Sequence, residues 1–144
     1  YTQVKAVTVQ ADGKILAGGN FMTFNNEPQG MLIRFNADGT KDTSFDIGVG
    51  GAPNTIVEKI IEQPDGKLLV TAVRNWNGNS YRGLIRLNAN GSFDTSFNMP
   101  EEVGTVSNVA LLPSGKIIII GQNTIDEEQI AVVNMDLSMG SVPL

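Results

Sequence analysis

Apolar and polar positions in this chain alternate over short runs that are separated by turns, a pattern typical of β-strands. One such run covers residues 4–9, and a second, almost wholly apolar run covers 15–17. A third run covers 31–35, and a short segment that ends in Phe follows at 42–45. Asp-Gly pairs between the runs favour tight turns that join antiparallel strands. Because no segment has a sustained helical period, we expect an all-β chain.

This succession of strands repeats along the chain with a period close to fifty residues. Asp12-Gly13-Lys14 returns as Asp65-Gly66-Lys67 and, with Ser in place of Asp, as Ser114-Gly115-Lys116. We therefore divide the single domain, residues 1–144, into repeats that cover approximately 4–55, 57–105 and 106–144. A period of this length is typical of β-propellers, in which each blade is an antiparallel sheet of about four strands.

A second motif supports the same division of the chain. Residues 36–45, which end in Asp-Thr-Ser-Phe, return at 88–97. The first two repeats should therefore superpose, with Ile15 on Leu68 and Phe45 on Phe97. The third repeat is degenerate: Val132 stands in place of the strand Arg, and the Asp-Thr-Ser-Phe motif is missing.

Three blades do not complete a ring, because propellers contain roughly four to eight blades. Apolar faces would stay open at both ends, and large apolar surfaces are association sites. We expect the remaining blades to come from the same longer chain or from a second copy. The chain also starts at Tyr1 within a strand pattern and without Met, which favours a longer protein.

The repeat motifs resemble the delta-60 repeat, a bacterial β-propeller repeat of uncharacterised function. The resemblance covers the first two repeats almost completely and the first half of the third. It is carried by residues 10–14, by Gly18-Gly19, by Arg34 and by residues 36–45; Thr71-Ala72 replaces the two glycines in repeat 2. The resemblance implies a secreted or cell-surface bacterial protein with a binding or structural role.

Composition excludes several classes of function. The formal net charge is −5 and the basic residues are scattered, so we expect no nucleic-acid partner. The chain has no Cys and no His, which removes disulfides, thiolate and imidazole metal ligands, and imidazole bases. No apolar run approaches the ~20 residues that span a bilayer. We expect no membrane insertion and no cofactor.

Arg34 and Arg86 occupy the same place in an otherwise apolar strand. One interpretation is a ring of guanidinium groups that lines a channel and binds an anion. The favoured interpretation is a structural pair with Asp42 and Asp94, because a buried charge is tolerated only when it is paired. The third repeat lacks both partners together, which supports the pair. We include Phe45 and Phe97 of the same motif among the structural residues.

The turn after the third strand also has the composition of a calcium loop. Asn36, Asp38 and Asp42 have a spacing that such a loop could use. A calcium site wants six to eight oxygens, and an EF-hand loop would continue to a Glu at the place of Ile47. The same residues are common in hydrogen-bonded turns, which is the interpretation we favour.

The loop around Trp76 is the candidate ligand site. It places the chain's one Trp beside Asn75 and Asn77, with Tyr81 close by, and aromatic faces beside amides suit a carbohydrate. The alternative is that Trp76 simply packs over the blade edge. Phe21 and Phe24 occupy the same loop in the first repeat.

Catalysis has little support in the sequence. The acidic run 126–128 could supply the two carboxylates of a glycosidase, but a solvated loop tip explains it more simply. We expect a non-catalytic binding or scaffold module that acts through its propeller surfaces in protein–protein or adhesive interaction. Carbohydrate binding at the Trp76 and Tyr81 loop is the alternative. A glycosidase is the least favoured hypothesis.

Overall fold

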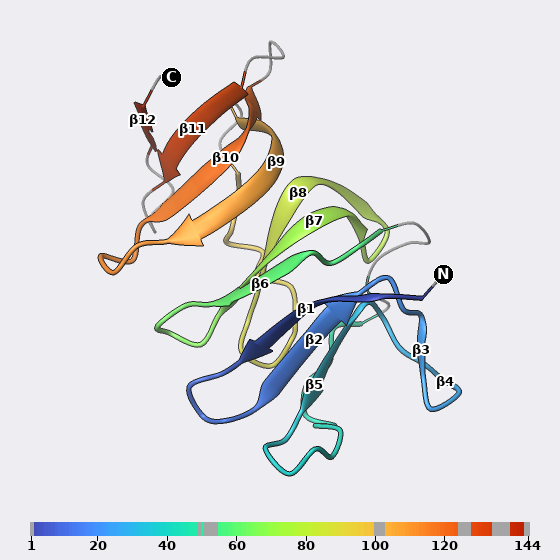
Figure 1. Ribbon diagram of the computed structural model, residues 1–144. Coiled ribbons are helices and arrows are strands. Elements are labelled where there is room, and N and C mark those ends of the chain that lie inside the picture. The colour runs from blue at the N-terminus through green and yellow to red at the C-terminus, as the bar shows by residue number, and fades with distance from the viewer. Residues whose placement is uncertain are drawn as a thin grey trace.

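The computed structural model describes residues 2–48, 50, 55–99, 103–123, 128–133 and 139–142. Within these ranges the chain forms twelve β-strands and no helix, so no helix of the described residues could cross a membrane. The strands form three main antiparallel sheets, which we call blades 1 to 3, and one small hairpin (Figure 1). The all-β propeller-type fold expected from the repeats is confirmed.

Blade 1 consists of β1 (Val4–Val9), β2 (Ile15–Gly19) and β5 (Leu32–Phe35), in that spatial order. The loop between β2 and β5 carries a small hairpin of β3 (Thr23–Phe24) and β4 (Glu27–Pro28). Gln10 and Gly13 close the turn between the first two strands through a backbone bond of 2.9 Å, and Gly13 has the positive φ that this turn requires.

Blade 2 repeats this order with β6 (Lys59–Glu62), β7 (Leu68–Trp76) and β8 (Asn79–Leu87). The middle strands of both blades pair with the third strands in matching register, Leu16 with Arg34 and Leu69 with Arg86. This matching register places Ile15 and Leu68 at equivalent positions, as the repeat alignment predicts.

The fourth segment of blades 1 and 2 is shorter than the sequence suggested. It is reduced to single β-bridges, Phe35 with Lys41 and Leu87 with Phe93. The chain then turns at once, because the amides of Phe45 and Phe97 donate to the carbonyl oxygens of Asp42 and Asp94.

Blade 3 has four strands: β9 (Val103–Leu111), β10 (Ile117–Asn123), β11 (Glu128–Val133) and β12 (Met139–Val142). The degenerate third repeat therefore keeps a complete sheet, and its last strand pairs with β11 from Val133–Met139 to Ile130–Val142. The sheet forms without the Asp-Thr-Ser-Phe motif because its strands are joined by backbone hydrogen bonds, which do not depend on particular side chains.

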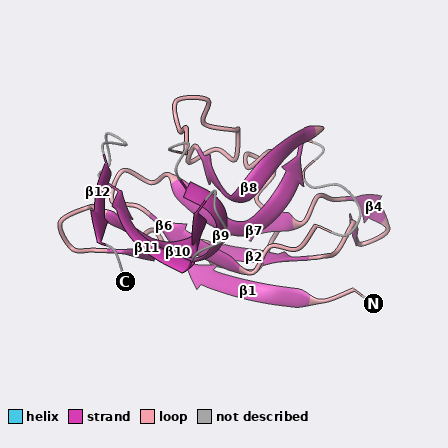
Figure 2. Ribbon diagram, turned by 90° about the horizontal axis from the view of Figure 1, so that it is seen from above, coloured by secondary structure: helices cyan, strands magenta, loops and turns pink. Residues whose placement is uncertain are grey.

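The core lies between blades rather than within one. One cluster of buried side chains joins blade 1 to blade 2, and another joins blade 2 to blade 3. Successive side chains of β7 point to opposite clusters, Leu68 and Val70 to the first and Leu69 to the second. Figure 1 shows blade 2 between blades 1 and 3, and Figure 2 shows the same strands from above, where the blades overlap.

Among the described residues, only the middle blade is covered on both faces. Leu68, Leu69 and Val70 have no exposed surface, as expected of a strand between two neighbours. The apolar middle strands are less well covered at the two ends, where Ile15 is half-buried and Ile120 is 45% exposed. The difference follows from position, because each end blade has one neighbour.

Candidate functional site

Two charged clusters with nearly the same geometry lie in blades 1 and 2. Nε of Arg34 donates to Oδ2 of Asp42 at 2.8 Å, and Nε of Arg86 to Oδ2 of Asp94 at 2.7 Å. A lysine from the first turn, Lys14 at 2.7 Å, reaches the same oxygen of Asp42. Lys67 does the same to Asp94 at 3.0 Å, so each carboxylate accepts from two cations.

The second oxygen of each carboxylate is used by the turn itself. Oδ1 of Asp42 accepts from the backbone amide and the hydroxyl of Ser44, and Oδ1 of Asp94 accepts likewise from Ser96. The hydrogen bonds from Lys14, Ser44 and Arg34 hold the pKa of the Asp42 carboxyl far below its usual value.

For Asp94, burial is the largest single influence and would raise the pKa. The hydrogen bonds from Ser96, Lys67 and Arg86 outweigh it together, so the pKa of the Asp94 carboxyl is also far below its usual value. Both carboxylates are therefore ionised at neutral pH and fully engaged.

Each guanidinium also lies over the ring of its own repeat's Phe. The Cζ of Arg34 is 4.5 Å from the ring centre of Phe45, and that of Arg86 is 4.7 Å from the ring centre of Phe97. Arg34 is buried and donates through Nη1 to the carbonyl oxygen of Ala89 in the next repeat. The guanidinium groups thus do not line an open channel, and the structure brings together the partners that the sequence paired.

The candidate calcium residues of the following turn do not converge. Oδ1 of Asp38 accepts from the amide and hydroxyl of Thr40, and Asn36 donates to the same hydroxyl. These bonds lower the pKa of the exposed Asp38 carboxyl, the hydroxyl of Thr40 contributing most. Asp42 points instead at its two cations. Within the described residues, no three His, Cys, Asp or Glu side chains gather where they could hold a metal ion.

Trp76 is not accessible to a ligand, which corrects the prediction that its loop forms a binding site. Its side chain has no exposed surface and packs in the cluster between blades 1 and 2. The neighbouring amide Asn77 is held too: it donates to Ile47 and accepts from Gly50 in the segment that joins the two blades. The preceding blade covers this hairpin, a long-range contact that the local sequence does not announce.

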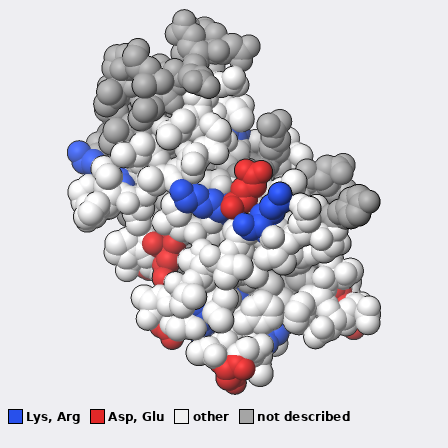
Figure 3. Space-filling model, viewed as in Figure 1, with Lys and Arg blue, Asp and Glu red and all other residues white. Residues whose placement is uncertain are grey.

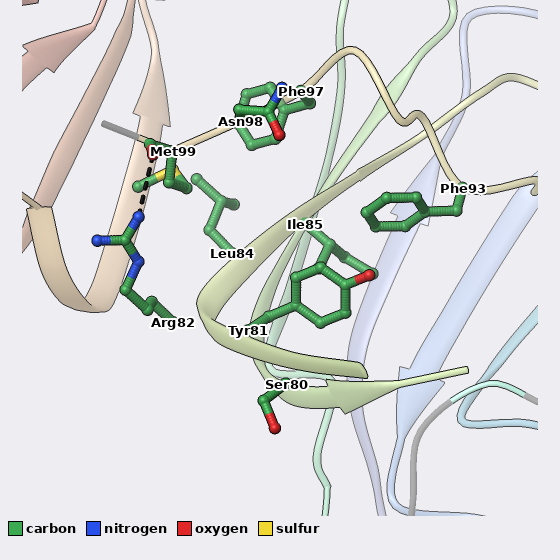
Figure 4. Close-up of a pocket in the computed structure, with 9 residues that line it drawn as sticks. All are labelled: Ser80, Tyr81, Arg82, Leu84, Ile85, Phe93, Phe97, Asn98 and Met99. Atoms are coloured by element: carbon green, nitrogen blue, oxygen red, sulfur yellow. Dashed lines mark hydrogen bonds between the residues drawn. The ribbon is translucent and has the colours of Figure 1, made fainter. Parts of the chain in front are cut away.

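Tyr81 is the member of the predicted site that borders an open groove. The groove has a volume of about 330 Å³ and lies between the start of β8 and the segment after Phe93. Tyr81 and Phe93 stand side by side on its wall, with ring centres 5.2 Å apart (Figure 4). Burial raises the pKa of the Tyr81 hydroxyl. The remaining lining residues are Ser80, Arg82, Leu84, Ile85, Phe97, Asn98 and Met99.

Arg82 fixes the rim of this groove rather than reaching into it. Its guanidinium donates to the carbonyl oxygens of Met99 and Val103, which joins blade 2 to the start of blade 3 (Figure 4). Asn75 lies outside the groove, where its side-chain oxygen accepts from the hydroxyl of Ser80. The other polar residues in the lining are Ser80, Tyr81 and Asn98, of which Ser80 directs its hydroxyl to Asn75.

A groove of about 270 Å³ occupies the equivalent place in blade 1. Gln29 stands there in place of Tyr81, and Lys41 in place of Phe93. Blades 1 and 2 thus share the position of the groove, whereas blade 1 lacks the wall formed by Tyr81 and Phe93. The sequence carries a signal for this difference, because Lys41 and Phe93 align at the 52-residue offset.

Charge does not mark a further site on the visible surface. Figure 3 shows acidic and basic side chains in small, separate groups, with no continuous patch of one sign on that face. Asp126 and Glu127 of the acidic run 126–128 lie outside the described residues.

A family model described as a domain of unknown function (DUF5122) beta-propeller matches residues 10–45 and 63–97. The two matched segments are the equivalent parts of repeats 1 and 2, from the first turn to the Asp-Thr-Ser-Phe motif. No curated protein matches the chain. The match supports a β-propeller repeat family, in agreement with the observed blades.

Proposed function

We propose that these β-propeller repeats form a non-catalytic module that binds a partner protein outside a bacterial cell. The observation that carries the proposal is the groove beside Tyr81. The charged residues of the repeat motif, Arg34 with Asp42 and Arg86 with Asp94, bind one another inside the blades. The lining of the groove, in contrast, differs between blades 1 and 2, which are otherwise equivalent. Function on a repeated scaffold is expected where equivalent positions diverge.

The shape and lining of the groove suit an apolar side chain of a partner. Its lining combines three aromatic side chains with Leu84 and Ile85 and with a few polar groups, and so resembles the pockets in which interface anchors are buried. A volume of about 330 Å³ is at the small end of ligand sites. It would hold one large side chain rather than a complete cofactor.

The absence of catalysis in this proposal rests on the state of the acidic groups. Asp42 and Asp94 are held ionised by two cations each, so neither can serve as a proton donor near neutral pH. With no His in the chain, general acid–base work would fall to other carboxylates. The exterior location is proposed from the resemblance of the repeats alone.

Carbohydrate binding is the second candidate, and the partly exposed aromatic wall of Tyr81 and Phe93 favours it. Tyr81 and Phe93 could stack on the C–H face of a sugar, while Asn98 would meet its hydroxyl groups. Trp76 has no part in this version, because it is buried.

Parallel selections would separate the two candidates. A phage-displayed peptide library and a glycan array are screened with the native chain, with Tyr81→Ala and Phe93→Ala, and with Gln29→Ala as the matched control in blade 1. We expect peptides with an aromatic or Leu anchor whose binding is lost in the first two variants and kept in the control. Glycan binding with the same dependence would favour the second candidate. Binding that ignores both aromatic residues would contradict the groove as the site.

A further inference from the structure

The face of blade 1 that points away from blade 2 is open and apolar. On β1, Val4 is 59% exposed and Val7 is 65% exposed. The equivalent residues of the other two blades are almost completely buried, each against the preceding blade: Val57 0%, Ile60 5%, Val106 4% and Val109 2%. The same sequence position is thus covered wherever a preceding blade is present.

A hollow in this face shows where the missing cover would sit. It has a volume of about 250 Å³, and most of its lining is apolar. The lining residues are Thr2, Val4, Ala17, Phe21, Thr23, Phe24, Ile33 and Phe35. Their counterparts in blade 2, Val70, Trp76, Ile85 and Leu87 among them, form the filled cluster between blades 1 and 2.

The hairpin turns of blades 1 and 2 show the same difference in a polar contact. Asn77 and Asn25 occupy equivalent hairpin turns and share a left-handed backbone, with φ of 47° and 51°. The backbone amide of Asn77 donates to the carbonyl of Gly50, its side-chain oxygen accepts from the amide of Gly50, and its side-chain nitrogen donates to Ile47. Asn25 has the same conformation but is exposed.

We propose that this face of blade 1 binds a further repeat of the same kind, which precedes Thr2 in the same polypeptide. That repeat would end in a linker similar to residues 45–50. Asn25 would form hydrogen bonds with this linker, as Asn77 does with Ile47 and Gly50. In the sequence, Thr55 at the start of blade 2 follows Gly50 by five residues. Thr2 is the residue equivalent to Thr55 in blade 1. The linker must therefore come from the segment joined directly to β1.

A second copy of the chain fits the face less well. Its one linker with the Ile-Gly-x-Gly pattern, residues 47–50, is already bound by its own Asn77. The sequences after Phe97 and after Val133 contain no such pattern. A second copy could cover the apolar surface, but it has no free linker for Asn25.

The first experiment extends the chain by one repeat. A duplicate of residues 2–54 is placed before Thr2, and Val7→Lys and Asn25→Ala are made in the original blade of the extended and unextended chains. We expect the extension to raise the Tm. Val7→Lys should lower the Tm of the extended chain by about 5 °C or more, because it buries a charge, and leave the unextended chain nearly unchanged. Val9→Lys is the control, since the equivalent of Val9 in blade 2 is Glu62.

Two outcomes would overturn the proposal. One is an equal effect of Val7→Lys on both chain lengths. The other is self-association of the unextended chain that Val7→Lys abolishes, which would make a second copy the occupant.

A second comparison needs no extension and covers the case in which the longer chain fails to fold. Asn77→Ala and Asn25→Ala introduce the same left-handed strain into the unextended chain, but only the first removes bonds to a linker. Asn77→Ala should therefore lower the Tm by several degrees more than Asn25→Ala. Equal shifts would remove the basis for assigning a linker to Asn25.

Discussion

At the scale of single residues, two sets of side chains repeat one arrangement around a buried carboxylate. An arginine, a lysine, a serine and a phenylalanine surround each of the two buried carboxylates, Asp42 and Asp94. Such a group is tolerated in the interior because every charge and every carboxylate oxygen has a partner. The motif Asp-Thr-Ser-Phe is therefore explained by its contacts in the structure.

Removing one arginine should uncover this dependence. Arg86→Ala leaves Asp94 buried with Lys67 as its one remaining cation, and we expect a loss of about 3 kcal/mol in the free energy of unfolding. Lys67→Met should cost less, because Lys67 is partly exposed. Urea denaturation measures both values. An unchanged midpoint for Arg86→Ala would contradict the structural role of the cluster.

The same carboxylates should make stability depend on acid pH. Their pKa values are lowered in the folded chain, so their contribution is complete above the unfolded value of about 4 and is lost as pH falls below it. We expect the free energy of unfolding to decrease between about pH 4 and pH 2. In the double variant Asp42→Asn, Asp94→Asn this decrease should be much smaller, as urea titrations at each pH would show.

Asp38→Asn provides the control for that experiment. This carboxyl also has a lowered pKa, but it is exposed and lies outside the buried clusters. Its substitution should leave the acid-dependent loss of stability largely intact. A loss that is the same in all three proteins would show that other groups cause it.

At the scale of elements, glycine decides how closely the first two strands approach. A Cβ at Gly19 would lie 1.9 Å from the carbonyl oxygen of Gln3, and one at the equivalent Gly121 would lie 2.1 Å from that of Thr105. In blade 2 this position is Ala72, and the first strand there is shorter, starting only at Lys59. In blades 1 and 3, which have glycine at this position, the first strand therefore pairs with the second over a longer stretch than in blade 2.

Gly19→Ala should separate the adjoining ends of β1 and β2. The clash is with backbone, which cannot move aside cheaply, and we expect a loss of about 1–3 kcal/mol. Hydrogen exchange should accelerate at the amide of Asn20, which donates to the same carbonyl oxygen of Gln3. Gly39→Ala, where a Cβ would meet no atom within 4 Å, should leave that amide unchanged. Unaltered exchange at Asn20 in Gly19→Ala would refute this view.

At the scale of the whole molecule, stability comes from the contacts between neighbouring blades. Both core clusters are shared between two repeats, and side chains such as Arg34 and Arg82 donate across the boundaries. A chain of this kind behaves as a row of units stabilised by nearest neighbours. The middle unit has two neighbours and the end units have one.

Native-state hydrogen exchange should follow this order. We expect the amides of β7 at Leu68–Thr71 to exchange more slowly than those of β2 at Ile15–Gly18, although both are middle strands with pairing on two sides. The reason is that β7 has covered side chains on both faces. Equal protection of the two strands would mean that the blades open as one unit.

Features that depend on local pattern and on repetition could be predicted from the amino-acid sequence. It predicted the strands, the turns at the Asp-Gly pairs, the blade period, and the pairing of Arg34 with Asp42 and of Arg86 with Asp94. These features follow from short-range chemistry, and the repeats checked one another. The degenerate third repeat still forms a four-stranded sheet, because backbone pairing does not need the motif.

Which surfaces are open, in contrast, depends on how the blades pack against one another. Trp76 is buried and Phe24 is half-buried at equivalent positions, and Val4 and Val57 differ in the same way. Nothing local distinguishes the members of these pairs, because burial depends on whether another blade lies against that face. The aromatic wall of the groove was also not evident from the sequence pattern, because Tyr81 and Phe93 are twelve positions apart and meet only when the blade folds.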